Sequence, residues 1–175
     1  MTKKSTWIIV GVVVIAILGV FMAYNSLVSL NEDVTSKWSQ VENQLQRRAD
    51  LIPNLVNAVK GYAAHEQQAI QEVTEARTQL VGAKGPEGAA IANDNLTSAI
   101  SRLLVVVENY PDLKADANFR ALMDELAGSE NRIAVARRDY NNSVQIYNTK
   151  IKTLPTSLYA DMLGFEPKSL VLETN

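Results

Sequence analysis

The sequence feature that most constrains this chain is an uncharged apolar run of eighteen residues, WIIVGVVVIAILGVFMAY, from Trp7 to Tyr24. As an α-helix the run extends about 27 Å, close to the hydrocarbon thickness of a bilayer. It is longer than the apolar segment of a usual signal peptide. Cleavage after Ala23 or Ser26 would also place Phe21 or Tyr24 where a small residue is required. The sequence therefore predicts an uncleaved single transmembrane helix over residues 7–24, preceded by a short flank, residues 1–6.

Four residues of the run are candidate anchor positions. Trp7 and Tyr24 stand at its two ends, where amphipathic rings prefer the membrane interface. Gly11 and Gly19 lie on one helical face and predict a smooth surface for close helix contact. The alternative is that these glycines only reflect the frequency of Gly in membrane helices.

The charges on either side of the run predict its orientation. Lys3 and Lys4 precede it, whereas Glu32 and Asp33 follow it. By the positive-inside rule the N-terminus stays cytoplasmic and the larger domain is exported across the membrane. A cytoplasmic domain is the alternative.

Heptad patterning continues directly after the run. Apolar residues recur every three or four positions, which is typical of a helix packed in a bundle: Leu27, Leu30, Val34, Trp38, Val41, Leu45, Ile52, Val56 and Val59. Arg48 occupies the one missing position, where its stem can lie on the core and its head needs a carboxylate partner. The membrane helix is therefore expected to continue into the domain.

Pro53 complicates this first helix, because a proline removes a helical hydrogen bond. We expect a break near Asp50–Pro53 and a second helix from about Leu51 to Val81, with Ile70, Val73, Arg77 and Leu80 on its inner face. The alternative is a kinked first helix that turns near Gly61–His65.

Two more helices complete an all-α fold. After a glycine-rich loop, Gly82–Gly88, a third helix is predicted from Ala89 to Asn109, with Ile91, Leu96, Ile100, Leu103 and Val107 inward. The fourth is predicted from Asp116 to Leu154, with a seam from Phe119 through Ser129, Ile133 and Tyr140 to Tyr147 and Ile151. Short loops between four helices indicate an antiparallel up-and-down four-helix bundle over residues 25–154.

An apolar tail, residues 155–175, follows Pro155. In an up-and-down bundle the fourth helix returns toward the membrane, so the tail is expected at the membrane surface. Its candidate interfacial residues are Leu158, Tyr159, Leu163 and Phe165. The alternative is a short flap folded on the bundle.

The sequence contains none of the common catalytic patterns. It has no cysteine and one histidine, His65, so thiol chemistry and the paired histidines of a di-iron bundle are absent. The formal charge of −2 argues against a nucleic-acid partner. We expect no enzyme activity, no cofactor and no bound metal.

A set of polar residues recurs along the predicted helices. Such charges usually form solvated faces with i,i+4 pairs. A polar layer through the bundle, or an interface patch, is the functional alternative, with these candidates: Arg47, Arg48, Asp50, Arg77, Glu130, Asn131 and Arg137.

Several blocks of the sequence resemble the LemA family. They are RRADLIPNLV (47–56), VKGYAAHE (59–66), YPDLKADANF (110–119), ENRIAVARRDYNNSV (130–144) and the closing Pro155, Gly164 and Phe165. The resemblance implies a bacterial single-pass membrane protein with a helical-bundle domain and no catalytic residues. It also implies links to membrane organisation, including magnetosome membranes, and to membrane metalloproteases of the HtpX type. Descriptions of the family place the N-terminus outside the cytoplasm, opposite to the orientation that Lys3 and Lys4 predict.

The expected function is that of a non-enzymatic, membrane-anchored helical scaffold. Its expected partners are the lipid bilayer, further copies of the chain in a homo-oligomer, and another membrane protein. The alternative is a regulator, adaptor or sensor of a membrane partner such as an HtpX-type metalloprotease.

Overall fold

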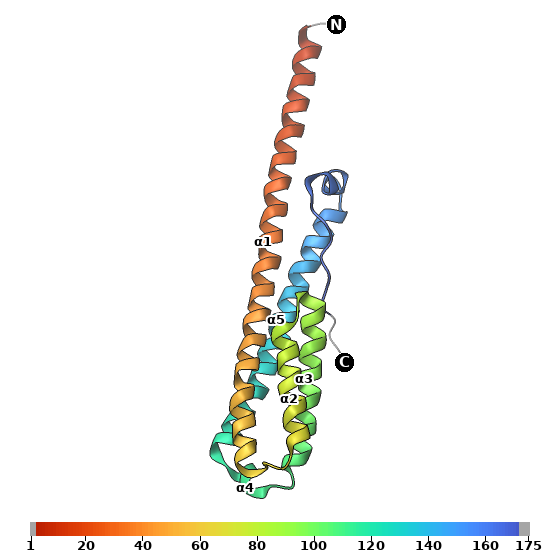
Figure 1. Ribbon diagram of the computed structural model, residues 1–175. Coiled ribbons are helices and arrows are strands. Elements are labelled where there is room, and N and C mark those ends of the chain that lie inside the picture. The colour runs from red at the N-terminus through yellow and green to blue at the C-terminus, as the bar shows by residue number, and fades with distance from the viewer. Residues whose placement is uncertain (1–2, 172–175) are drawn as a thin grey trace. The chain divides into compact units, whose positions relative to one another are not determined.

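A computed structural model describes residues 3–171, and within that range the chain is all-α. The helices are α1 (Lys3–Tyr62), α2 (Gln67–Gly82), α3 (Gly85–Val107), α4 (Pro111–Ala115) and α5 (Ala117–Lys152), as Figure 1 shows. Two 3₁₀ turns follow, Thr156–Leu158 and Asp161–Leu163. The ends of the predicted flank and tail, residues 1–2 and 172–175, lie outside the described residues.

The chain forms two compact units. The anchor unit comprises the described residues up to Ser36 together with 142–168. The bundle unit comprises residues 37–141 and the last described residues, 169–171. Each unit is described separately.

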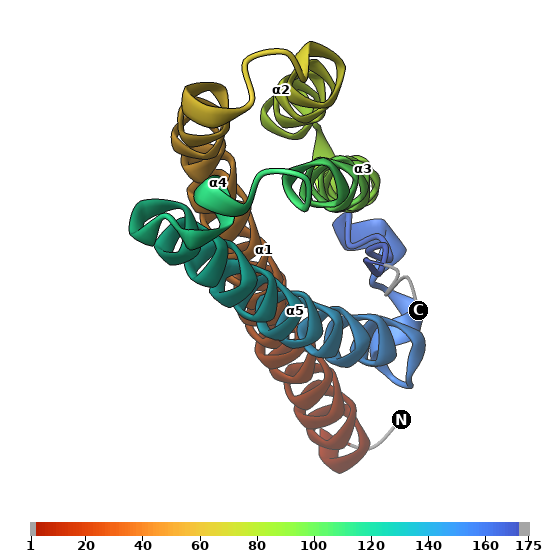
Figure 2. The ribbon, with the colours of Figure 1, turned by 90° about the horizontal axis from the view of Figure 1, so that it is seen from below.

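The bundle unit is a helical bundle, which confirms the predicted fold class. Figure 2 looks onto the end of this bundle where α4 lies. The apolar residues at heptad spacing form its core: Val41, Leu45, Ile52, Val56 and Val59 of α1, and Phe119, Leu126, Ile133 and Tyr140 of α5, are buried. Trp38 and Tyr140 meet edge to face, with ring centroids 5.3 Å apart. The burial of these residues stabilises the bundle mainly by removing apolar surface from water.

The predicted break near Asp50–Pro53 is wrong, because α1 continues through Pro53 to Tyr62. The chain instead turns at residues 63–66, as the alternative predicted. Pro53 lacks the N–H that would bond to the carbonyl oxygen of Ala49, four residues earlier. Arg77 of α2 donates its Nε–H to that oxygen at 2.9 Å. A side chain from the neighbouring helix thus replaces the backbone donor that the proline removes.

The third and fourth helices differ from prediction in detail. The loop after α2 is shorter than Gly82–Gly88, because Gly85, with φ of +70°, starts α3 and Pro86 lies in its first turn. Ile91 is exposed rather than inward, whereas Leu96, Ile100, Leu103 and Val107 are buried. α5 begins after Asp116, whose carboxylate accepts a hydrogen bond from the backbone N–H of Phe119 at 2.9 Å.

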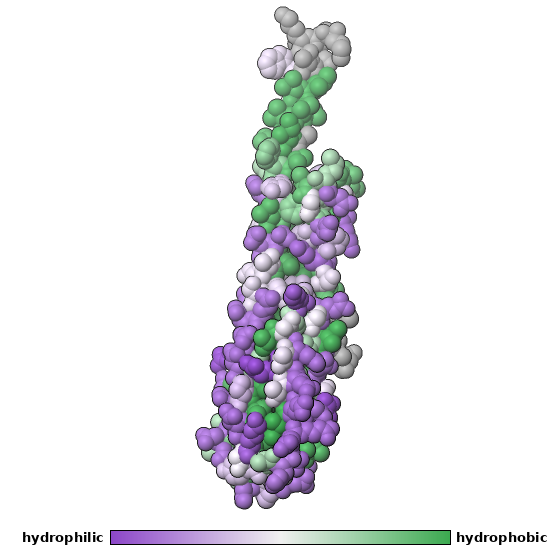
Figure 3. All heavy atoms as spheres, viewed as in Figure 1, coloured by the Kyte–Doolittle hydropathy of each residue, from purple (hydrophilic) through white to green (hydrophobic). Residues whose placement is uncertain are grey.

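In the anchor unit the large apolar residues of α1 from Trp7 to Tyr24 are exposed. Figure 3 shows them as a continuous apolar surface along the N-terminal part of the helix. α1 contains one apolar segment long enough to cross a membrane. None of the eighteen most apolar consecutive residues of this segment is buried inside the structure. The small core of the unit consists of Leu27, Val34, Val144, Tyr147, Ile151 and Ala160. This arrangement needs an external apolar phase around the N-terminal helix.

The segment after α5 is held by specific contacts. In the anchor unit the rings of Tyr24 and Phe165 meet edge to face, with centroids 5.7 Å apart. The Asn148 side-chain amide donates to the carbonyl of Lys168 at 2.8 Å and accepts from its N–H at 2.9 Å. In the bundle unit Asn141 makes the same two bonds to Val171, at 2.8 and 2.9 Å. Each asparagine therefore satisfies both backbone groups of one tail residue.

Candidate functional site

A layer of polar side chains crosses the bundle unit and is the main cluster of charged groups inside it. It consists of Arg48 from α1, Asn93, Asp94 and Thr97 from α3, and Glu130 and Arg137 from α5. The Arg48 guanidinium forms an ion pair with Glu130, donates to the Asn93 side-chain oxygen and donates to the Thr97 hydroxyl at 3.1 Å. Arg48 therefore joins three helices through one side chain.

A second, longer ion pair belongs to the same layer. The Arg137 guanidinium lies 3.8 Å from the Asp94 carboxylate. Two arginines and two carboxylates thus occupy the layer, and their formal charges balance. This balance matters because an uncompensated buried charge would be strongly destabilising.

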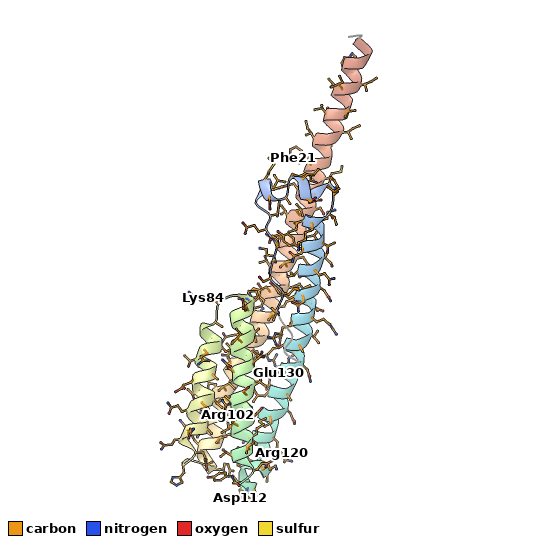
Figure 4. The ribbon with its side chains drawn as sticks, turned by 90° about the vertical axis from the view of Figure 1, so that its right-hand side faces the viewer. Phe21, Lys84, Arg102, Asp112, Arg120 and Glu130 are labelled. Carbon is orange, nitrogen blue, oxygen red and sulfur yellow. The ribbon has the colours of Figure 1, made fainter. Side chains whose placement is uncertain are left out.

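Burial is the main influence on the electrostatics of Arg48, whose side chain is only 4% exposed. Desolvation lowers the pKa of its guanidinium, while the nearby carboxylates of Glu130 and Asp94 oppose that effect. Glu130 remains 40% exposed, so the layer is in contact with solvent at this residue of α5 (Figure 4). Arginine stays protonated despite such a shift, so Arg48 is a permanent cation of the layer.

Some polar atoms of the layer have no hydrogen-bond partner among the described residues. They are Nε of Arg48, the side-chain nitrogen of Asn93 and Nη2 of Arg137. Native cores rarely leave such atoms unpaired. The unpaired atoms therefore reduce the stability that the layer contributes to the bundle unit.

The structure brings together three of the predicted polar candidates, Arg48, Glu130 and Arg137, and separates the others. Arg47 pairs with Glu125 at 3.0 Å on the surface, and Asp50 accepts a hydrogen bond from Gln46. Arg77 makes the bond to α1 described above. Asn131 lines a groove of about 420 Å³ between α1 and α5, together with Gln40, Asn43, Gln44, Arg132, Val135, Ala136 and Asp139.

Sequence reasoning missed the contribution of α3 to the layer. Asn93 is fully buried, one turn before the core residue Leu96 and one turn after Ala89 and Ala90. A polar residue at an inward heptad position was the available signal. Its partner could not be inferred, because Arg48 is 45 residues away in the chain.

The anchor candidates all lie on α1. Trp7 and Tyr24 are exposed, and a Cβ built on Gly11 or Gly19 would meet nothing within 4 Å. A side chain at either glycine would therefore meet no atom of the described residues at its Cβ, although Gly19 borders the groove described below.

Of the tail candidates, Leu158 and Leu163 lie in the two 3₁₀ turns of the anchor unit, and Tyr159 and Phe165 each follow shortly after one of the turns. Leu158 is 72% exposed, and Leu163 is also exposed, whereas Tyr159 and Phe165 are half-buried. Met162, which belongs to the same turns, is 87% exposed. The turns and the C-terminal end of the apolar run border a groove of about 470 Å³, and Tyr159 lies in its lining.

These features define an all-α protein, with one candidate membrane-spanning helix among the described residues. The chain belongs to the LemA family, because the family model matches residues 37–174. The match begins at Lys37, where the bundle unit also begins. The recognised resemblance is thereby confirmed.

The relatives include magnetosome proteins. Two MamQ proteins of Paramagnetospirillum magneticum are each 31% identical over 88% of this chain and 66% of their own length. MamQ of Magnetospirillum gryphiswaldense is 30% identical over 83% of this chain and 63% of its own length. A protein LemA of Metamycoplasma hominis is 24% identical over 79% of this chain and 64% of its own. The matched region is thus slightly less than two thirds of the length of these relatives.

Proposed function

We propose that this protein is a non-enzymatic scaffold of the bacterial plasma membrane that self-associates or binds other membrane proteins. The observation that carries the proposal is α1, an uninterrupted helix that contains both the apolar run and one side of the bundle core. A continuous helix connects the apolar run to the bundle core more stiffly than a flexible linker would. The name of the relatives, magnetosome protein, supports the role in membrane organisation that the family resemblance implies.

The use of the polar residues supports a structural role for the bundle. Arg48, Glu130 and Arg137 are engaged in pairing between helices, and Arg77 bonds to a backbone carbonyl. Each of these charged side chains has a partner on a neighbouring helix of the bundle unit. The bundle is therefore proposed to present a surface rather than to carry out a reaction.

Self-association is proposed to use the Gly11 face of the membrane helix. Small residues let two helix backbones approach closely in lipid. The protein in mild detergent is expected to be larger than a monomer by light scattering. Gly11→Leu should shift it toward monomer, whereas Val13→Leu, on the opposite side of α1, should not.

A monomeric wild type in mild detergent would refute the self-associating scaffold. If that monomer still crosslinks in native membranes to one different membrane protein, the alternative role of regulator or adaptor is favoured. If Gly11→Leu and Val13→Leu behave alike, the glycine face is not the contact.

The proposed orientation places the bundle outside the cytoplasm. It is supported by Lys3 and Lys4 before the apolar run, since the positive-inside rule acts on charges close to the membrane segment. Protease added to intact spheroplasts should then digest the bundle. A bundle that survives until the cells are lysed would reverse the orientation.

The 3₁₀ turns after α5 are proposed to touch the membrane surface. Leu158 and Met162 are strongly exposed apolar residues in the same unit as the apolar run. The chain has no cysteine, so Met162→Cys introduces a single thiol. A water-soluble maleimide should label it several-fold more slowly in lipid nanodiscs than in detergent. A thiol at the exposed Val105 of α3 is the control and should react equally in both, and equal labelling of residue 162 would refute membrane contact.

A further inference from the structure

The groove of the anchor unit has walls of two different kinds. One wall is the end of the apolar run on α1 and the residues just after it, Gly19, Val20, Met22, Ala23 and Ser26. The other wall comes from the end of α5 and the first 3₁₀ turn, and its polar members are Lys150, Thr156 and Tyr159. Figure 4 shows the labelled Phe21 of α1 beside these turns.

Two polar side chains of the second wall, Lys150 and Tyr159, lack a partner for the ammonium and the hydroxyl respectively among the described residues. No carboxylate of residues 3–171 forms an ion pair with Lys150. The Tyr159 hydroxyl is buried and has no hydrogen-bond partner among the described residues. A buried donor without a partner costs free energy, so a ligand oxygen that accepted from it would be favoured.

We propose that this groove binds one anionic phospholipid, with the phosphodiester at Lys150 and Tyr159 and the start of an acyl chain along Gly19 and Ala23. The proposal rests on the proposed function, because it requires α1 to span the membrane.

The polarity of the groove matches that of a phospholipid. The α1 wall changes from apolar at Gly19 and Val20 to polar at Ser26, over the two helical turns that leave the apolar run. In a bilayer this is the depth at which acyl chains give way to headgroups. Gly19 carries no side chain, and a Cβ there would meet nothing within 4 Å, so an acyl chain can lie against the helix backbone.

The charge of the groove favours an anionic lipid over a zwitterionic one. Lys150 is the one cationic residue in the lining of this groove. A lysine near an anionic headgroup changes affinity about fivefold, which is the preference expected for phosphatidylglycerol over phosphatidylcholine. A lipid held by both the membrane helix and the turns after α5 would tie these segments together within the anchor unit.

The test uses the full chain in nanodiscs that contain equal amounts of phosphatidylglycerol and phosphatidylcholine. Native mass spectrometry then measures which lipids stay bound to the protein after it is released from the nanodiscs. The wild type should retain phosphatidylglycerol with about a fivefold preference, and Lys150→Gln should abolish that preference. Lys152→Gln is the matched control, because Lys152 lies two residues further along α5, is exposed and does not line the groove.

A second variant tests the apolar wall without changing charge. Ala23→Leu places a larger side chain in the groove and should reduce retention of both lipids, with an unchanged helix content by circular dichroism. The proposal is overturned if Lys150→Gln keeps the wild-type preference, if Lys152→Gln loses it equally, or if Ala23→Leu retains lipid as the wild type does. A wild type that fails to enter nanodiscs would refute the membrane anchor as well.

Discussion

The two units of this protein place their apolar residues in opposite ways. In the bundle unit the apolar residues at heptad spacing are buried, and the charged groups that enter the interior are paired. In the anchor unit the longest apolar run is exposed, and so are Leu158 and Met162. The first unit completes its own core, whereas the second requires an apolar surrounding. Helix α1 therefore lies in two environments along its length: its residues from Val41 to Val59 help to form a protein core, and its apolar run requires an apolar surrounding.

The largest expected effect comes from breaking the polar layer of the bundle unit. Arg48→Ala leaves Glu130, Asn93 and Thr97 without their shared partner and should lower the free energy of unfolding by about 3 kcal/mol. Denaturant titration of the full chain in mild detergent, followed by circular dichroism, measures this loss. The matched control is Arg47→Ala, whose exposed pair with Glu125 should cost less than about 0.5 kcal/mol.

Equal losses in Arg48→Ala and Arg47→Ala would show that the layer does not hold the bundle. Arg48→Leu distinguishes a role of Arg48 in the stability of the bundle from a role in an interface with a partner. If that variant is stable and still self-associates as the wild type does, Arg48 has no role in an interface.

A somewhat smaller effect is expected at the bond that accommodates Pro53. Arg77→Met removes the donor to the buried Ala49 carbonyl and should cost about 2 kcal/mol. In a Pro53→Ala background, where the backbone N–H can bond to the same carbonyl, the cost should fall below about 1 kcal/mol. A double-mutant cycle from thermal unfolding measures the coupling. Additive effects of the two substitutions would contradict the replacement of one donor by the other.

The next effect concerns the last described residues of the bundle unit. Asn141→Ala removes both bonds to Val171 and should lower the free energy of local opening by about 1.5 kcal/mol. Faster hydrogen exchange at Ser169–Val171 is the expected readout. Asn142→Ala, at an exposed neighbouring asparagine, should leave that exchange unchanged.

The corresponding contact of the anchor unit is weaker. Phe165→Leu removes the ring pair with Tyr24 and should cost about 1 kcal/mol, because aromatic pairs add roughly that amount beyond their buried area. The loss should appear as faster hydrogen exchange in residues 156–165, with the bundle unit unaffected. Tyr24→Phe keeps the ring and is the control. An increase in hydrogen exchange confined to the anchor unit would support the contrast between the two units. An equal increase in both units after Phe165→Leu would contradict it.

The smallest effect is a pH dependence at the surface of the bundle unit. Hydrogen bonds from Arg102, at 2.7 Å, and from Gln68 hold the pKa of the Glu72 carboxyl below its ordinary value. Stabilisation from a lowered pKa is present above the unfolded pKa, about 4.3, and is lost as the pH falls through the folded pKa. Arg102→Gln should therefore reduce the fall in Tm between pH 6 and pH 3. Arg120→Gln, at an exposed position of α5, should not change it.

The parts of the fold that the sequence predicted are those set by local periodicity. The seams of α1 and α5, the position of α5 and the burial of Arg48 follow from the three- and four-residue spacing of apolar residues. The continuation through Pro53 was not predictable in the same way. It depends on Arg77, 24 positions away, and no local rule relates a proline to a distant arginine.

The polar layer was predictable only in part for the same reason. Arg48, Glu130 and Arg137 were identified as unusual residues, but their connection runs through Asn93, Asp94 and Thr97 of α3. Asp94 and Thr97 resemble ordinary polar positions, and the partner of the inward Asn93 depends on the rotation of α3 about its axis. The contacts of the tail were equally unpredictable. The side-chain amides of Asn141 and Asn148 bind backbone groups of Val171 and Lys168, and backbone groups are the same whatever the residue type.

The bond between Arg77 and the Ala49 carbonyl has a consequence for how sequences of this family can diverge. A proline at residue 53 exposes one acceptor at one place on α1, and an arginine at residue 77 is its complement. Without Arg77 the Ala49 carbonyl loses its hydrogen bond, and without Pro53 the backbone N–H competes with Arg77 for that carbonyl. The two residues are therefore expected to be inherited together or replaced together. Covariation between these two alignment columns would then record the docking of α2 on α1 more directly than any apolar contact, because apolar partners can be exchanged one at a time.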